Sequence, residues 1–245
     1  MRLTEEVCLV GSGAVGLSNQ YDCHVYLIDG GSALALVDAG CGIEVPQILQ
    51  NVKAEGFDPA AITHILLTHA HADHAGGCAA LKAELEGVEV CLSREEAAFL
   101  SEGNEDEIGL TTARPLGFYP ANYRLAPCPV DVALSDNEQI AVGDLKLTAL
   151  ATPGHSRGSM CYLFEGKRRI HLFSGDVVHF RGLISLLNCV GSSLSAYRQH
   201  IGKLAGLNVD ALLPGHLLFA VNRGQQHIDQ AIDAFRGLGV PKCTF

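Results

Sequence analysis

Segment 68–74 reads Thr-His-Ala-His-Ala-Asp-His and so gathers three imidazoles and one carboxylate within a few residues. Imidazole and carboxylate are ligands that zinc accepts, and the lack of cysteine in this segment argues against a closed structural zinc site. The segment directly follows an apolar run, so we predict that it starts at a strand end and leads into a helix. His69 and His71 should then point to one side, and Asp73 and His74 to another, which suits two metal ions better than one.

Three later turns repeat one placement, in which a potential ligand follows a glycine at the end of an apolar run. These are His155 in Pro153-Gly154-His155, Asp176 in Ser174-Gly175-Asp176 and His216 in Pro214-Gly215-His216. Glycine permits the chain reversal that can bring such a side chain inward. One such turn is usually no more than a turn, but the repetition favours three further ligands.

The apolar periodicity predicts the elements that must position these residues. Strands are expected at 7–10, 24–28, 33–37, 62–67, 88–92, 138–142, 145–150, 160–164, 170–173 and 211–213, and helices at 44–55, 73–85, 193–204 and 222–235. A β-rich stretch followed by a mixed one occurs twice. This order predicts an α/β protein with two mixed β-sheets flanked by helices, an αββα sandwich. Because no Pro/Ser-rich linker divides the chain, we expect one domain over 1–245.

Segment 101–129 is rich in acids, glycine, proline and aromatic residues and is too long for an ordinary turn, so we predict an active-site flap. Phe118, Tyr119 and Tyr123 are candidates for substrate binding. The alternative is that these rings anchor the segment to the core.

These motifs together resemble the metallo-β-lactamase-fold hydrolases, and the glyoxalase II-like branch in particular. The resemblance runs from Val37-Asp38-Ala39-Gly40 through the His-x-His-x-Asp-His signature to Leu213-Pro214-Gly215-His216. It implies the sandwich fold and a dinuclear site. By this resemblance His69, His71 and His155 bind one ion, Asp73, His74 and His216 bind the second, Asp176 bridges the two, and Asp38 supports the ligands from outside.

Two divalent ions about 3.5 to 4 Å apart can share a water, lower its pKa and hold a hydroxide that attacks a carbonyl or phosphoryl centre. Asp73 or Asp176 would orient that water, and no Gly-x-Ser-x-Gly motif suggests a serine nucleophile instead. We therefore predict a metal-dependent hydrolase of a small-molecule ester-like bond, a thioester or a lactone. Two Zn²⁺ per chain are expected, with iron or manganese as alternatives.

The turn after Asp176 supplies two more candidates. His179 lies three residues further on, where similar lactonases carry a phenol, and is predicted to give a hydrogen bond or a proton to the leaving group. Arg181 could meet an anionic group of the substrate.

Two other activities of the same family stay open at this point. An iron-dependent persulfide dioxygenase would share several ligands, although the Gly-Arg-Thr-Asp-like stretch expected after the Gly-Asp turn is replaced by Val177-Val178-His179-Phe180-Arg181. A phosphodiesterase or ribonuclease Z-like nuclease is disfavoured by the acidic charge balance. A lactamase is disfavoured because many of these enzymes carry cysteine where this chain has Asp176.

Composition limits the partners. With 17 Lys plus Arg against 27 Asp plus Glu and no basic run, nucleic acid is not expected as a substrate. No run approaches the roughly 18 apolar residues of a membrane helix, and the acidic start does not resemble a signal peptide. The nine cysteines include no Cys-x-x-Cys pair and are expected to be reduced thiols. We expect a cytoplasmic protein with a small-molecule substrate and no membrane partner, and leave a homodimer open.

The segment 11–16, Gly-Ser-Gly-Ala-Val-Gly, matches the dinucleotide-binding pattern Gly-x-Gly-x-x-Gly. That site needs a helix that opens at the glycines, so that its N-terminus meets the pyrophosphate. Turn-like residues and then another strand follow here, so we do not expect a Rossmann site.

Overall fold

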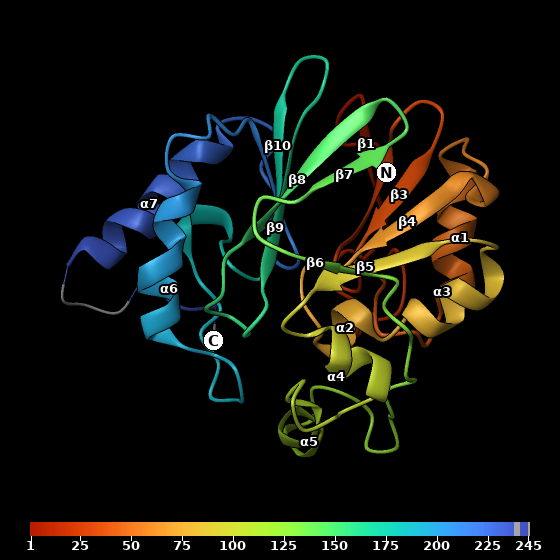
Figure 1. The fold of residues 1–245 in the computed structure, drawn as a ribbon, viewed down its shortest axis with the longest axis horizontal. Helices are drawn as coiled ribbons and strands as arrows, with labels where there is room; N and C mark the ends of the chain where they lie inside the picture. Colours follow the sequence, from red (N-terminus) through yellow and green to blue (C-terminus); the bar gives the residue numbers. More distant parts are fainter. Residues whose placement is uncertain (238–240, 245) are drawn as a thin grey trace. The chain divides into compact units, whose positions relative to one another are not determined.

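The computed structural model describes residues 1–237 and 241–244. Their contacts divide the chain into two compact units, Met1–Leu134 with Val142–Asp144 and Ser135–Ala141 with Leu145–Phe245. Figure 1 follows the chain through both units. The expectation of one domain over 1–245 stays a prediction.

A six-stranded mixed sheet forms the centre of the first unit, with its strands in sequence order. They are β1 (Val7–Gly11), β2 (Val25–Asp29), β3 (Leu34–Val37), β4 (Ile62–Leu66), β5 (Glu89–Ser93) and β6 (Val132–Leu134). The first three pair antiparallel, whereas β3, β4, β5 and β6 pair in parallel. All but β6 were predicted. This strand has three residues, too few for an alternating pattern to be read.

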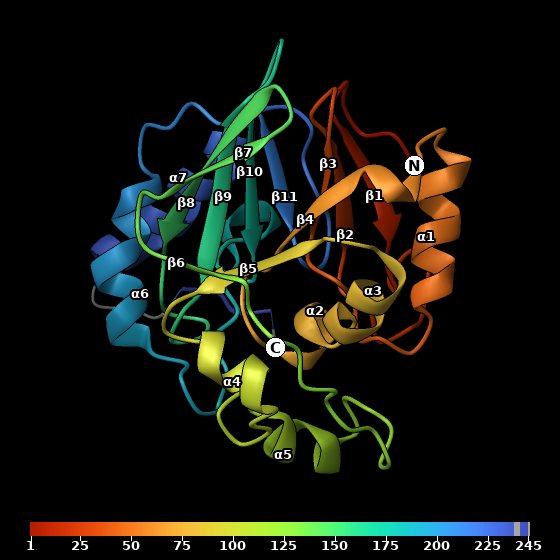
Figure 2. The same ribbon diagram turned by 45° about the vertical axis from the view of Figure 1, so that its right-hand side comes forward.

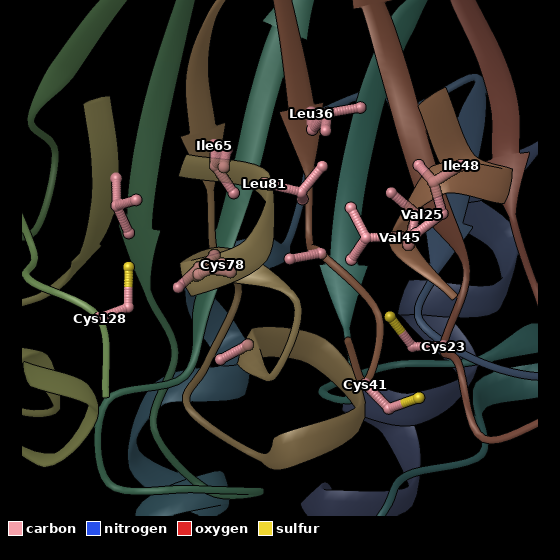
Figure 3. Packing of buried hydrophobic residues seen from close by; sticks show 14 of the residues in the cluster. Cys23, Val25, Leu36, Cys41, Val45, Ile48, Ile65, Cys78, Leu81 and Cys128 are labelled. Carbon is pink, nitrogen blue, oxygen red and sulfur yellow. The ribbon is translucent and has the colours of Figure 1, made fainter. Parts of the chain in front are cut away.

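Short helices complete the first unit. They are α1 (Val45–Ala54), η1 (Pro59–Ala61), α2 (Ala72–Ala75), α3 (Cys78–Glu84), α4 (Ala97–Glu102), α5 (Leu110–Ala113) and η2 (Arg114–Leu116). Figure 1 shows α1 and α3 on the same side of the sheet. Because successive strand residues face opposite sides, every second residue of β2 and β3, such as Val25 and Leu36, meets Ile48 of α1 and Leu81 of α3 in one buried cluster (Figure 3).

The single helix expected at 73–85 is interrupted at Gly76 and Gly77. The chain from Ala39 to Cys41 lies against this point, where the Gly77 amide donates to Gly40 O at 2.9 Å and the Ala39 amide donates to His74 O at 2.7 Å. A Cβ on Gly77 would lie 2.0 Å from Ala39 O. The break therefore lets two backbone segments approach each other beside segment 68–74, which we call the His-rich segment.

Replacing Gly77 with alanine is expected to destabilise the metal-free protein by about 2 kcal/mol, because the added methyl overpacks a rigid backbone contact. Urea unfolding of the metal-free chain measures this. Gly202→Ala is the matched control, since a Cβ there meets no atom within 4 Å. Equal unfolding midpoints for the two variants would contradict the expected clash.

A five-stranded mixed sheet, in the order β11-β10-β9-β8-β7, forms the centre of the second unit. Its strands are β7 (Gln139–Val142), β8 (Leu145–Ala151), β9 (Met160–Glu165), β10 (Ile170–Gly175) and β11 (Ala211–Pro214), and its helices are η3 (Phe180–Gly182), α6 (Leu194–His200), η4 (Ile201–Leu204) and α7 (Gly224–Arg236). Strands β10 and β11 are parallel, whereas β9 is antiparallel to both β8 and β10.

The helices α6 and α7 lie on the same side of this second sheet (Figure 2). On α7, Ile228, Ala231, Ile232 and Phe235 follow helical spacing and pack in a buried cluster that also contains Leu172 of β10. The predicted pair of mixed sheets, each with its own helices, is thus confirmed.

Other sequence expectations can be compared with the fold directly. In the described part of the chain, no helix is both long and apolar enough to cross a membrane. All nine cysteines are free thiols. Residues 12–24 form turns and irregular chain after β1, so the glycines of segment 11–16 open no helix.

Candidate functional site

The first group of candidate ligands lies in the loop after β4 and at the start of α2. Nε2 of His69 lies 3.1 Å from Nδ1 of His71, and the two rings meet edge to face. Two nitrogens bound to one tetrahedral zinc at 2.0 to 2.1 Å would be about 3.3 Å apart. The spacing of this pair therefore fits two ligands that share one ion.

Asp38 connects the end of β3 to this loop. Its φ of 62° is left-handed, a conformation that Asp adopts more readily than most residues. Its buried carboxylate accepts hydrogen bonds from the Thr68 amide at 2.8 Å and from the Thr68 hydroxyl, and it lies 2.8 Å from Nδ1 of His74. A carboxylate only accepts, so Nδ1 of neutral His74 carries the proton and Nε2 presents its lone pair.

Asp73 and His74 form a second pair on α2. Nε2 of His74 lies 3.6 Å from Oδ2 of Asp73, and the His74 ring is fully buried. The ring centroids of His69 and His74 lie 4.1 Å apart. The segment thus brings imidazole and carboxylate donors together, and the division of these donors between two ions stays a prediction.

Glu96 is a supporting residue that the sequence analysis missed. Its carboxylate is buried between β5 and α4 and accepts a hydrogen bond from the Ala70 amide at 2.7 Å. The contact holds the backbone between His69 and His71. The one signal in the sequence is an acid directly before the apolar run 97–100, which does not reveal its partner.

Two tyrosines of segment 101–129 donate hydrogen bonds within the first unit, and Tyr119 bonds directly to a candidate ligand. Tyr119 donates from its hydroxyl to Oδ1 of Asp73 at 2.7 Å, and Tyr123 donates to the backbone oxygen of Cys41 at 2.7 Å. Burial is the main cause that raises the pKa of Tyr119 well above its usual value, so its phenol stays protonated. Phe118, by contrast, is 52% exposed. Substrate binding by the three rings stays a prediction.

The second group of candidate ligands lies at one end of the second sheet. Asp176 follows β10 and His216 follows the parallel neighbour β11, so both side chains start from the same sheet edge. Oδ2 of Asp176 lies 3.5 Å from Nε2 of His155 and 3.6 Å from Nε2 of His216. One carboxylate oxygen therefore lies near two imidazole nitrogens, and the bridging role of Asp176 stays a prediction.

Ser185 and Tyr197 support this second group through hydrogen bonds that involve backbone oxygens. The sequence analysis missed both residues. Nδ1 of His155 donates to the backbone oxygen of Ser185 at 2.7 Å, which leaves Nε2 as the lone-pair nitrogen. The Tyr197 hydroxyl lies 3.2 Å from that same oxygen and 3.1 Å from the backbone oxygen of Asp176. No local pattern could have revealed this, because the acceptors are backbone atoms placed by the fold.

His179 and Arg181 take different places. His179 is fully buried, with Nε2 2.8 Å from the Ser185 hydroxyl and Nδ1 3.3 Å from the backbone oxygen of His216. Arg181 is exposed, with its guanidinium over the Phe180 ring and its amide bonded to His227 of α7. The roles predicted for both residues in catalysis and substrate binding stay predictions.

The chain belongs to the metallo-β-lactamase superfamily, since the model of that family matches residues 19–216. It is 32% identical over 210 residues to the acyl-coenzyme A thioesterase MBLAC2 of Homo sapiens, covering 79% of this chain and 72% of that protein. It is 30% identical over 185 residues to a hydroxyacylglutathione hydrolase of Dechloromonas aromatica, covering 76% and 55%.

Solved structures give the same fold. The subclass B3 metallo-β-lactamase BJP-1 of Bradyrhizobium japonicum matches with a TM-score of 0.73 at 24% identity, over 95% of this chain and 89% of that one. The family and fold predicted from the sequence are thus confirmed. Membership in this fold implies a metal-binding site. The chemistry of each donor group fits metal ligation, because contacts at Nδ1 of His69, His74 and His155 orient these rings and leave Nε2 for a metal ion.

Proposed function

We propose that the protein is a metal-dependent hydrolase of acyl thioesters. In this proposal the two donor groups together hold two divalent ions, zinc in the first instance. The ligands are His69, His71 and His155 for one ion, Asp73, His74 and His216 for the other, and Asp176 as the bridge. The observation that carries most weight is Oδ2 of Asp176, which lies within 3.6 Å of both His155 and His216.

When bound, the two ions supply Lewis acidity, which lowers the pKa of a water and polarises the scissile carbonyl. The side chains of the protein orient the attacking water and the imidazole ligands. Asp73 and Asp176 are the carboxylates that can hydrogen-bond the attacking water and take up its proton. Asp38 and Ser185 keep the imidazoles of His74 and His155 turned so that Nε2 presents its lone pair.

The thioester is favoured over the lactone by the leaving group. A thiol has a pKa of about 8.5, so the thiolate can depart without a proton donor, whereas an alkoxide needs one. The predicted donor, His179, is enclosed, and both of its ring nitrogens make contacts in the second unit. Both relatives named above also act on acyl groups, and acyl-coenzyme A is a thioester.

The test is a substrate panel with the purified, metal-loaded chain. We expect it to hydrolyse acyl-coenzyme A or acyl-glutathione, to lose this activity with a chelator, and to regain it with Zn²⁺. The melting temperature should fall on chelation, because the ions bind the folded chain. Mass spectrometry during turnover should detect no acylated side chain.

Other results would redirect the assignment. Oxygen consumption with a persulfide by the iron-loaded chain would establish the dioxygenase instead. Turnover of phosphodiesters alone would establish the nuclease class. A chain that binds no metal after reconstitution would overturn the proposed function.

A further inference from the structure

Tyr119 connects segment 101–129 to the His-rich segment 68–74. Its hydroxyl donates to Oδ1 of Asp73 at 2.7 Å and accepts from the Asp73 amide at 3.2 Å. These residues are 46 positions apart in the sequence. One phenol therefore fixes both the backbone and the carboxylate of Asp73.

The Tyr119 ring is itself held by neighbours. It stacks on Tyr123 with ring centroids 5.3 Å apart and on Tyr21 with centroids 6.4 Å apart. Arg114 pairs with Glu105 and donates to the backbone oxygen of Tyr123 at 2.8 Å, so the stacked rings are held without the Tyr123 hydroxyl. Because the neighbouring rings hold the Tyr119 ring in place, its hydroxyl stays in position to donate to Asp73.

The contact also selects between the two oxygens of Asp73. Oδ1 accepts the phenol proton, while Oδ2 lies 3.6 Å from Nε2 of His74. A hydrogen bond to one oxygen restricts the rotation of the carboxylate about its last bond. The other oxygen is thereby kept beside His74, the residue with which Asp73 would share an ion.

We propose that Tyr119 is a positioning residue for Asp73, and that segment 101–129 sets the affinity of the ion at Asp73 and His74 through it. This inference rests on the proposed metal site. Partners of carboxylate ligands typically change metal affinity about 10- to 100-fold. By linkage, occupancy of the ion should in turn stabilise segment 101–129 in its place on the first unit.

The test compares Tyr119→Phe with Tyr123→Phe. Both variants keep the stacked rings and lose one hydrogen-bonded hydroxyl from the same segment, but only the first loses a contact with a proposed ligand. Competition with a chromophoric chelator should show one ion bound about 10- to 100-fold more weakly in Tyr119→Phe. Tyr123→Phe should bind both ions as the wild type does. Thermal unfolding of the metal-free forms should give similar midpoints for the two variants.

The outcomes separate the inference from the function on which it rests. Wild-type affinity in Tyr119→Phe overturns the inference and leaves the proposed function in place. An equal loss of affinity in Tyr123→Phe also overturns it, because the effect would then come from general loosening of the segment. A wild-type chain without any bound metal overturns both.

Discussion

Asp176→Ala is expected to release at least one ion and to lower kcat/KM for a thioester about a thousandfold. The carboxylate that lies within 3.6 Å of two imidazole Nε2 atoms would be lost. In the proposed function this charge would help to hold the metal ions. Each ion would supply several kcal/mol of transition-state stabilisation, and about 4 kcal/mol corresponds to a thousandfold in rate. Elemental analysis and steady-state kinetics measure the two effects.

Asp210→Ala is the matched control for this variant. Asp210 belongs to the same unit, and its carboxylate accepts from the Ile170 amide at 2.9 Å, at the opposite end of β10 from Asp176. We expect it to lose some stability and to keep its metal. Two tightly bound ions and wild-type kinetics in Asp176→Ala would contradict the bridging role.

Asp38→Asn is expected to fold but to bind metal about 10- to 100-fold more weakly. Asparagine tolerates the left-handed backbone at position 38 and keeps one oxygen for the Thr68 amide. The amide nitrogen that would then face His74 is a donor, so it turns Nδ1 into the acceptor and moves the ring proton to Nε2. Nε2 could no longer offer its lone pair.

Isothermal titration of the metal-free protein with Zn²⁺ measures this change. Asp58→Asn removes a carboxylate from the same unit at an exposed turn, where Asp58 caps η1 through the Ala60 amide. It should bind Zn²⁺ like the wild type. If Asp38→Asn also did so, the role of Asp38 in setting the His74 tautomer would be wrong.

The candidate ligands and most of the strands could be predicted from short stretches of sequence. The candidate ligands lie in short motifs at strand ends, so their types and positions could be read directly. Most strands followed from short apolar runs bounded by turn residues. The interruption of the helix at Gly76 and Gly77 could not be read, because it depends on the backbone of Ala39 approaching from another part of the chain.

The residues behind the ligands were harder to predict. Asp38 was expected to support the site because the family resemblance pointed to it, and it does contact His74. Glu96 and Tyr197 contact backbone atoms, which leave no trace in residue type. For Tyr119 the sequence offered substrate binding or anchoring, and the structure adds a hydrogen bond to a candidate ligand.

The use of a backbone oxygen at Ser185 has a consequence for how this protein can evolve. Every amino acid carries that oxygen, so drift at position 185 leaves the acceptor of His155 in place. The length of the chain between Asp176 and Ser185 is far less forgiving. An insertion or deletion there would shift the oxygen that both His155 and Tyr197 approach, and through Tyr197 would disturb Asp176 as well. Homologues that keep this metal site should therefore vary in residue type across this turn but agree in its length.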